Sequence, residues 1–217
     1  MAILARLAFD TPVHLDQVPY EGIERIQPED LEYARELGLE LKLIGTAERI
    51  GTGLSVRVHP IFLYPGHPLA AVSGPFNAVT VESEAITEIT MSGPGAGGPQ
   101  TASAVLADVI SAMIPPASTP PTSQVLEIVE DVVSSFYLHL EVADEPGVLA
   151  QVARVLADED VSVKSVVQKG LAEQARLVMV LHPVLESRFA AALREIARLD
   201  ILRAPPRSIR VLEEEFA

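Results

Sequence analysis

The sequence predicts an α+β protein made of two parts with a proline-rich segment between them. In residues 1–114, alternating apolar residues indicate an antiparallel-leaning sheet with helices packed on it. In residues 131–217, the elements follow the order βαββαβ, which is typical of a ferredoxin-like fold. Residues 115–130 begin with four prolines between positions 115 and 123, so we predict an extended linker there.

The first part shows signals for both helices and strands. Pro28 stands at a favourable first helical position and Gly38 at a favourable stop, while Gly51-Thr52-Gly53 separates two alternating strands as in a hairpin. The expected elements are helices at 2–9, 28–37 and 101–113, and strands at 39–44, 54–58, 77–83 and 86–92. The helix at 2–9 has no capping residue ahead of it, so we interpret it as the end of a longer helix.

The last part shows a more regular pattern. Phe136, Leu138, Leu140 and Val142 alternate as in a strand with one buried face. The expected elements are strands at 136–142, 161–167, 176–182 and 208–212, helices at 148–156 and 185–199, a turn at 144–147 and a loop at 169–174. Two helices would cover one face of this sheet and leave the other free. We therefore expect a partner sheet or subunit on the free face.

Composition and charge argue against several classes of partner. The 217 residues carry a formal net charge of −14, and the only lysines are Lys42, Lys164 and Lys169. Clustered Lys and Arg bind nucleic acids and anionic membranes, so we expect neither as a partner. The absence of cysteine excludes a thiolate metal site and fits an intracellular protein. No apolar run approaches about 18 residues and no signal-peptide pattern opens the chain, so we expect a cytoplasmic protein.

A glycine-rich stretch at 93–105 is the most informative segment of the chain. It joins a strand pattern to a helix pattern, and glycine lets the backbone approach a ligand closely. The free N–H groups of the helix start would suit an anionic or strongly polar group. Gly93, Gly95 and Gly98 also spell G-x-G-x-x-G, but prolines instead of a second parallel strand follow the helix, which argues against a dinucleotide-binding unit. The alternative is a tight turn without a ligand.

The turn Asp144-Glu145-Pro146-Gly147 is a second candidate site. It places an acidic side chain beside the N–H groups of a helix start, an arrangement that can hold both ends of a zwitterionic amino acid. Gln168, at the end of the second strand of this part, could reach the same place. The alternative is that Asp144 only caps the helix, with Pro146 in its first turn.

The remaining polar residues favour structural roles. His59 and His67 have no Asp, Glu or Cys at metal-ligand spacing, and His182 stands at a strand end, so we predict no metal site. A solvated face is the expectation for the alternating carboxylates Glu82, Glu84 and Glu88, and a solvated tail for 213–215. Lys42 is interpreted as a cation at a strand edge.

Several segments together point to a family. In the first part these are 3–9, 21–23, 30–43, 67–70, 77–79 and 93–105, which resemble the catalytic and dimerisation region of homoserine dehydrogenase. In the last part, 144–149 and 165–170 resemble an ACT domain of the type appended to that enzyme. The family usually has proline where Gln100 stands, a departure that could alter the helix start.

The resemblance implies NAD(P)-dependent interconversion of homoserine and aspartate semialdehyde, in threonine and methionine biosynthesis. It implies that Gly95, Ala96 and Gly97 lie on the cofactor-binding, substrate-facing side of an active site. The family's Rossmann domain and its catalytic lysine and aspartate would lie upstream of Met1, and Lys42 matches a structural lysine. We therefore assign no catalytic residue, expect no NAD(P) binding by this chain alone, and expect the isolated chain to be inactive.

The resemblance also implies a regulatory role for the last part. ACT domains bind small effectors at an interface between two such domains, and the family effector is threonine. The implied effector site consists of Asp144, Glu145, Pro146, Gly147, Val148 and Gln168. We expect a homo-oligomer because each part needs its exposed sheet face covered.

Two functions remain open on the sequence. The chain is either the C-terminal portion of a homoserine dehydrogenase, working with a Rossmann domain that could be a separate chain, or a non-catalytic amino-acid-sensing and oligomerisation protein. The segment encoded upstream of Met1 would discriminate between them.

Overall fold

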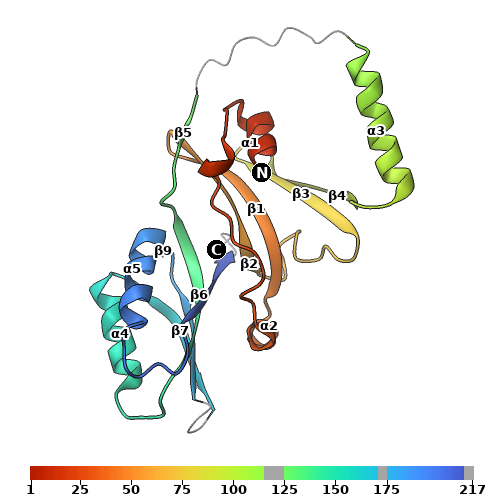
Figure 1. Ribbon diagram of the computed structural model, residues 1–217. Coiled ribbons are helices and arrows are strands. Elements are labelled where there is room, and N and C mark those ends of the chain that lie inside the picture. Colours follow the sequence, from red (N-terminus) through yellow and green to blue (C-terminus); the bar gives the residue numbers. More distant parts are fainter. Residues whose placement is uncertain (115–124, 171–174, 213–217) are drawn as a thin grey trace. The chain divides into compact units, whose positions relative to one another are not determined.

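The protein folds into two compact units, which we describe separately. A computed structural model describes residues 1–114, 125–170 and 175–212. The larger unit combines Met1–Tyr64 with Val125–Ala217, and the smaller unit is Pro65–Gln124. The two segments of the larger unit are far apart in the sequence but contribute strands to one sheet (Figure 1).

The first segment of the larger unit consists of helices followed by a long hairpin. Its elements are α1 (Ala2–Phe9), the 3-10 turn η1 (Leu15–Gln17), α2 (Pro28–Glu36), β1 (Glu40–Ile50) and β2 (Gly53–Leu63). Pro28 occupies the first turn of α2, and Gly38 follows the helix with φ 71°, a conformation that glycine adopts freely. The predicted helices and hairpin are confirmed, and the strands are longer than predicted because the pairing runs without a break from Glu40–Leu63 to Ile50–Gly53.

The second segment has the predicted ferredoxin-like order. Its elements are β5 (Glu127–Ile128), β6 (Val133–Glu141), α4 (Val148–Asp158), β7 (Val163–Lys169), β8 (Arg176–Leu181), β9 (Val184–Leu185), α5 (Glu186–Ile196) and β10 (Arg207–Leu212). The four long strands are arranged β10-β6-β8-β7, which places the first and last strands of the βαββαβ unit side by side. The predicted α+β class and the βαββαβ order are confirmed.

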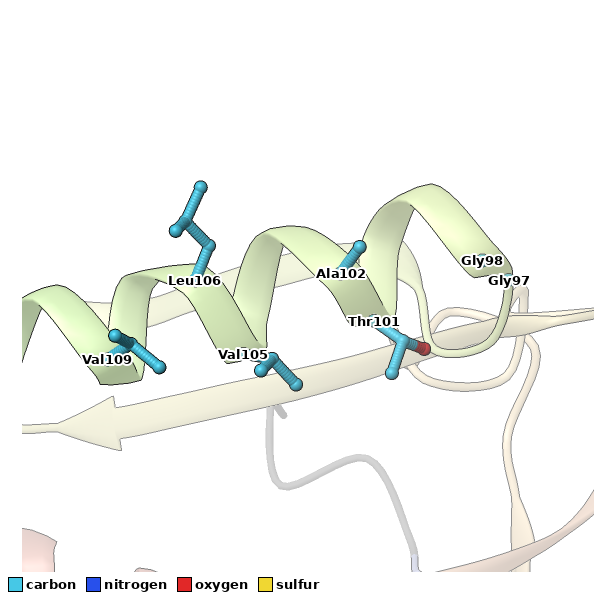
Figure 2. A pocket seen from close by; sticks show the side chains of 7 residues that line it. All are labelled: Gly97, Gly98, Thr101, Ala102, Val105, Leu106 and Val109. Carbon is cyan, nitrogen blue, oxygen red and sulfur yellow. The ribbon is translucent and has the colours of Figure 1, made fainter.

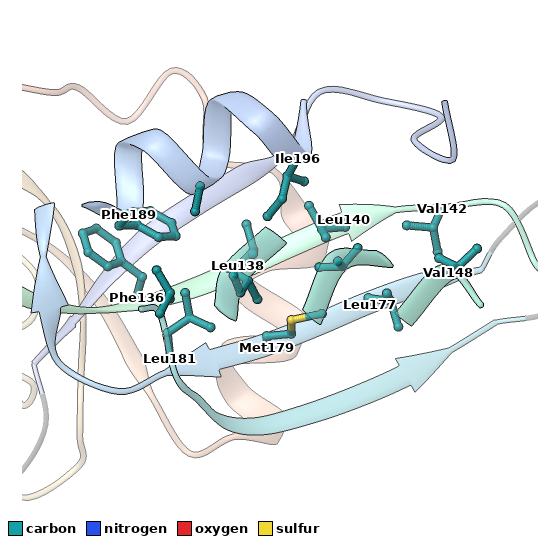
Figure 3. Packing of buried hydrophobic residues seen from close by; sticks show 14 of the residues in the cluster. Phe136, Leu138, Leu140, Val142, Val148, Leu177, Met179, Leu181, Phe189 and Ile196 are labelled. Atoms are coloured by element: carbon teal, nitrogen blue, oxygen red, sulfur yellow. The ribbon is translucent and has the colours of Figure 1, made fainter. Parts of the chain in front are cut away.

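Helices α4 and α5 cover one face of this sheet, as predicted. Leu138, Leu140 and Met179 from the strands pack with Val152 of α4 in one buried cluster. Figure 3 shows these strand side chains between the sheet and the helices, with Phe136 beside Phe189. The two phenyl rings stack with centroids 3.9 Å apart. Burial of alternating strand residues against helical stripes accounts for the regular pattern in the sequence.

The opposite face of the sheet is only partly free, because a segment of the same chain packs on its central strands, whereas Val167 of β7 stays 39% exposed. Tyr137 and Val178 of the sheet belong to a buried cluster with Tyr33 and Ala34 of α2. Thus the first segment of the same chain covers this part of the face. Periodicity in the sequence indicates that a face is buried, but it cannot say which element buries it.

The ferredoxin-like sheet is also not a separate sheet. Strand β10 pairs in parallel with β2 through Arg210–Ile61, Val211–Phe62 and Leu212–Leu63. The order of the described strands is therefore β1-β2-β10-β6-β8-β7, with β5 on β2 and β9 on β6. The predicted limits 1–114, 115–130 and 131–217 remain a prediction. Of the predicted linker, 115–124 lies outside the described residues, and 125–130 contains β5.

The smaller unit contains β3 (Phe76–Ser83), β4 (Thr87–Pro94) and α3 (Gly98–Ala112). The predicted strands are confirmed, but they form a two-stranded sheet of their own instead of joining the β1–β2 sheet. No residue of α3 is buried, so the predicted packing of this helix on a sheet stays a prediction. Apolar spacing predicted the helix correctly but could not identify what its apolar side contacts.

Within the part of the chain that the structure describes, we find no helix with the length and apolar character needed to cross a bilayer. The predicted loop at 169–174 and the predicted tail at 213–215 lie wholly or mainly outside the described residues.

Candidate functional site

The glycine-rich stretch forms a short exposed loop between β4 and α3 in the smaller unit. Gly93 and Pro94 end β4, Gly95 to Gly97 form the loop, and α3 begins at Gly98, three residues earlier than predicted. The Gly95 N–H donates to the carbonyl of Pro75 at 2.8 Å, which ties the loop to the start of β3. The helix N-terminus is therefore presented directly after the loop, as the sequence predicted.

One position of this loop requires glycine, and a second is close to a neighbouring side chain. Gly97 has φ 134° and ψ 149°, a conformation that residues with a side chain rarely adopt. A Cβ at Gly95 would lie 2.0 Å from Asn77 Nδ2 and 2.4 Å from its Cγ, so the exposed Asn77 side chain would have to move to admit one. A Cβ at Gly98, in contrast, would meet nothing within 4 Å. The loop shape thus depends on Gly97 in particular.

The start of α3 offers an apolar surface beside the loop. An open hollow of about 770 Å³ is lined by Gly97, Gly98 and side chains of the first three turns of α3. Figure 2 shows Ala102 and Leu106 on one side of the helix, and Thr101 and Val105 on another. Val105 and Leu106 are each more than half exposed. The helix N-terminus combines N–H groups for a polar ligand group with apolar side chains for its remainder.

The turn after β6 is exposed and leads directly into α4. Asp144 to Gly147 are exposed, whereas Val148 is buried in the core of the sheet. Gly147 is the N-cap residue of α4 with φ 91°, and its carbonyl accepts the Gln151 N–H at 3.0 Å. Asp144 therefore does not occupy the N-cap position, and Pro146 precedes the helix instead of lying in its first turn. This corrects the expected place of Pro146, and the capping role of Asp144 stays a prediction.

Gln168 lies at the same end of the sheet as this turn. It is exposed on β7 and pairs with Leu177 of β8, which in turn pairs with Leu140 near the end of β6. Strands β6 and β7 therefore run in the same direction on either side of β8, and their C-terminal ends lie at the same end of the sheet. The structure thus brings the predicted effector residues to one end of the sheet, two strands apart.

A charged network connects this sheet to α2 inside the larger unit. Asp30 of α2, which is 1% exposed, accepts from the Gln27 N–H at 3.0 Å and lies 3.2 Å from His139 Nδ1 of β6. Arg207 of β10 reaches Asp30 at 3.4 Å and Glu141 at 3.2 Å. Burial alone would raise the pKa of Asp30, but its bonds with His139 and Gln27 and the charge of Arg207 hold it below its ordinary value.

A second connection begins next to Gln168. Lys169, the last residue of β7, forms an ion pair with Glu36 of α2, and its ammonium lies 5.0 Å from the centre of the Tyr33 ring. Arg176 donates to the Tyr33 hydroxyl at 3.4 Å. The end of the sheet at Gln168 and helix α2 therefore share direct polar contacts that no sequence motif indicated.

The contacts of His67 and His182 agree with the structural roles predicted for these residues. His67 is buried and accepts the Leu69 N–H at 3.1 Å, and burial lowers its pKa. The His182 N–H donates to the Ser162 carbonyl at 2.9 Å after β8. In residues 1–114, 125–170 and 175–212 there is no group of three or more His, Cys, Asp or Glu placed to hold a metal ion.

The other charged residues also lie as predicted. Glu82 and Glu88 face each other across the β3–β4 hairpin, and they are exposed together with Glu84. Lys42 is half-buried in β1 opposite Ile61.

Sequence reasoning missed a cluster around Glu186. Both carboxylate oxygens of Glu186, at the start of α5, accept from Arg210 at 2.8 and 2.7 Å, and one also accepts from Ser134 at 2.9 Å. Arg57 of β2 lies 3.5 Å away. Burial would raise the pKa of Glu186, but Arg210, Ser134 and Arg57 hold it below its ordinary value. The residues come from distant segments, so no spacing signal could have found them.

Comparisons with known proteins cover both candidate sites. The sequence model of homoserine dehydrogenase matches residues 1–110, just over half of the 217. The chain belongs to the homoserine dehydrogenase family. The ACT domain model matches residues 136–200, which include Asp144 to Val148 and Gln168. The glycine-rich loop lies within the homoserine dehydrogenase match.

Individual homoserine dehydrogenases match almost the whole chain. That of Neisseria gonorrhoeae is 35% identical over 97% of this chain and 52% of its own length, and that of Mycobacterium leprae is 37% identical over the same shares. The crystal structure of a homoserine dehydrogenase from Thiobacillus denitrificans is similar with a TM-score of 0.87 and 35% identity, over 98% of this chain and 51% of that chain. The chain therefore spans about half the length of the homoserine dehydrogenases it matches, and it corresponds to their C-terminal region with its ACT domain.

Proposed function

We propose that this chain supplies the substrate-facing wall, the oligomer contacts and the regulatory domain of an NAD(P)-dependent homoserine dehydrogenase. The observation that carries the proposal is the continuous match to homoserine dehydrogenases, which includes the loop at Gly95 to Gly97. That loop presents a helix N-terminus beside exposed apolar residues, a surface suited to a polar ligand with an apolar part. The cofactor would contact Gly95, Ala96 and Gly97 only when a nucleotide-binding domain also holds it.

The reaction itself needs groups that we do not assign to this chain. Oxidation of the homoserine hydroxyl requires a general base near the substrate while hydride leaves for the nicotinamide. Lys42, the only lysine of the first part, lies in a paired strand, which supports a structural role. We therefore expect the isolated chain not to turn over homoserine.

A complementation assay tests this proposal. The 217-residue chain would be mixed with a separately expressed nucleotide-binding domain of a homoserine dehydrogenase, and NADP reduction with homoserine would be followed. Activity that requires both components supports the proposal. Turnover by this chain alone at about 10 per second, a typical enzyme rate, would contradict it and would direct attention to Lys42.

The effector site is the second part of the proposal. We infer that threonine or a similar small amino acid binds at Asp144 to Val148, with Gln168 contributing from a neighbouring ACT domain. The exposed turn, the N–H groups at the start of α4 and the carboxylate of Asp144 support recognition of a zwitterion. If the complementation assay is silent while threonine binds, the non-catalytic sensing and oligomerisation function becomes the better assignment.

The oligomer contacts have an independent test. Strand β7 ends the order of described strands, and Val166 and Val167 on it are 43% and 39% exposed, so this edge supports pairing between ACT domains. Light scattering at micromolar concentration is expected to give at least twice the 23.3 kDa of one chain. A single species at the mass of one chain would contradict the homo-oligomer.

A further inference from the structure

The larger unit contains a polar cavity that neither candidate site includes. It has a volume of about 140 Å³, enough for a molecule of a few heavy atoms, and lies against residues 55–59 of β2. The lining residues that matter chemically are Glu21, Arg57, His59, Glu130, Glu186 and Arg210. They come from the segment before α2, from β2, from the segment after β5, and from the start of α5 and β10. The cavity therefore lies between the two segments of the larger unit.

The charged side chains around the cavity differ in how many close hydrogen bonds and ion pairs they form. Glu186 is saturated by Arg210 and Ser134, with Arg57 nearby. Glu21, in contrast, reaches Arg210 Nη1 only at 3.5 Å, and its side chain is 42% exposed. At that distance the contact is weak, so Glu21 and the Nη1 donor of Arg210 can each take a better partner.

His59, which lines the cavity, carries a buried nitrogen without a hydrogen-bond partner among the described residues. Its side chain is buried, with the residue 4% exposed, and Nδ1 lies 3.3 Å from the Pro60 carbonyl oxygen. A carbonyl only accepts, so Nδ1 must carry the proton and Nε2 must be an acceptor in the neutral ring. Among the described residues Nε2 has no hydrogen-bond partner. Buried polar atoms in native proteins are nearly always paired, so a donor is expected at this nitrogen.

We propose that this cavity binds a small α-amino acid as the zwitterion, with the ammonium between His59 Nε2 and Glu21 and the carboxylate on Arg210. A ligand with only a negative charge would be repelled by the three glutamates of the lining. A ligand with only a positive charge would be repelled by the guanidinium groups of Arg57 and Arg210. A zwitterion places each of its charges against the opposite sign and supplies the donor that His59 lacks. The site is separate from the Asp144 turn and does not depend on the proposed function.

Calorimetric titration of the 217-residue chain tests the site. The probes are glycine, L-serine and L-threonine, with acetate and glycinamide as partners that each lack one charge. The zwitterions are expected to bind at least about tenfold more tightly than acetate or glycinamide, since each lost charge removes a charge-assisted hydrogen bond. Equal binding of acetate and glycine, or no binding of any amino acid at millimolar concentration, would overturn the proposal.

Variants assign the binding to this cavity. Glu21 is half-exposed and weakly bonded, so Glu21→Gln should fold, and we expect it to weaken binding of the zwitterions by at least about tenfold. Glu24→Gln, which changes an exposed glutamate on the same segment, is the matched control and should bind as the parent does. Asp144→Asn should also leave this binding intact. Binding that survives Glu21→Gln but disappears in Asp144→Asn would place the ligand at the turn and refute the cavity site.

Discussion

His139 Nδ1 lies 3.2 Å from Asp30 Oδ1, and both side chains are 1% exposed. The contact joins β6 of the ACT domain to helix α2 of the homoserine dehydrogenase match, 109 positions earlier in the chain. Arg207 approaches the same carboxylate from β10. A buried carboxylate is tolerated only when its partners compensate for lost water, so these two side chains depend on each other.

Removal of the Asp30 charge is expected to destabilise the larger unit. Asp30→Asn keeps the shape and an acceptor for the Gln27 N–H, but it leaves Arg207 and His139 without their anion. Breaking a buried pair in this way costs about 3 kcal/mol. Urea unfolding followed by circular dichroism would measure the loss. Glu32→Gln, which changes an exposed residue on the same helix, is the control and should change stability by less than about 0.5 kcal/mol. Equal stabilities of the two variants would contradict the assigned role of Asp30.

Stability is expected to fall as the pH drops from about 6.5 to about 4, because of His59. Burial, together with Arg210 and Arg57, lowers the pKa of His59 to about 4, whereas Glu186 opposes this effect. The unfolded chain therefore binds one more proton than the folded chain in that window, and stability falls by up to about 1.4 kcal/mol per pH unit.

His59→Gln isolates this contribution. His67, whose pKa burial also lowers, adds a slope of the same sign, so the informative quantity is the difference between parent and variant. From about pH 7 to about pH 5, the unfolding free energy of the parent should fall more steeply than that of the variant. Parallel curves would show that His59 takes up no proton on unfolding.

The glycine loop offers a comparison of two adjacent positions. Gly97→Ala forces a side chain into a backbone conformation with φ 134°, at a cost of about 1–3 kcal/mol, and should distort the start of α3. Gly98→Ala places its methyl group in open space and should be tolerated. In the complementation assay we expect Gly97→Ala to lose at least about tenfold in rate, the equivalent of about 1.4 kcal/mol, and Gly98→Ala to retain the parent rate. Similar losses in both variants would argue against a specific role for the loop shape.

Threonine is expected to raise the melting temperature through the Asp144 turn. At a hundredfold excess over Kd, a ligand that binds only the folded state adds about 2.7 kcal/mol of stability. Asp144→Asn should reduce this ligand-induced rise, while Asp158→Asn, at the opposite end of α4, should leave it unchanged. A rise that is the same in the parent and in both variants would remove the effector site from this turn.

Local patterns in the sequence were sufficient for most elements. The alternation of Phe136, Leu138, Leu140 and Val142 and the helical spacing after Gly147 predicted β6 and α4, because one face of each is buried in the same core. Likewise, the glycine positions predicted the loop between β4 and α3. These features depend on neighbours in the sequence, which a single chain displays directly.

Features that depend on distant segments were not predictable in this way. The parallel pairing of β10 with β2 involves backbone groups, which leave no side-chain pattern. Asp30, Arg57 and Glu186 have no distinguishing spacing, and their roles follow only from packing between segments. The family resemblance identified the correct family and pointed to two candidate sites, but it could not reveal the network that joins the ACT domain to α2.

The pairing of β10 with β2 has a consequence for any attempt to transplant the regulatory domain. A fragment excised at residue 131 would leave the outer edge of β10 without its neighbour and would uncover Tyr137 and Val178, which α2 now shields. An open strand edge beside an apolar face invites association with other chains. Chimeras that carry this ACT domain into another protein therefore need the hairpin β1–β2 and helix α2 as well.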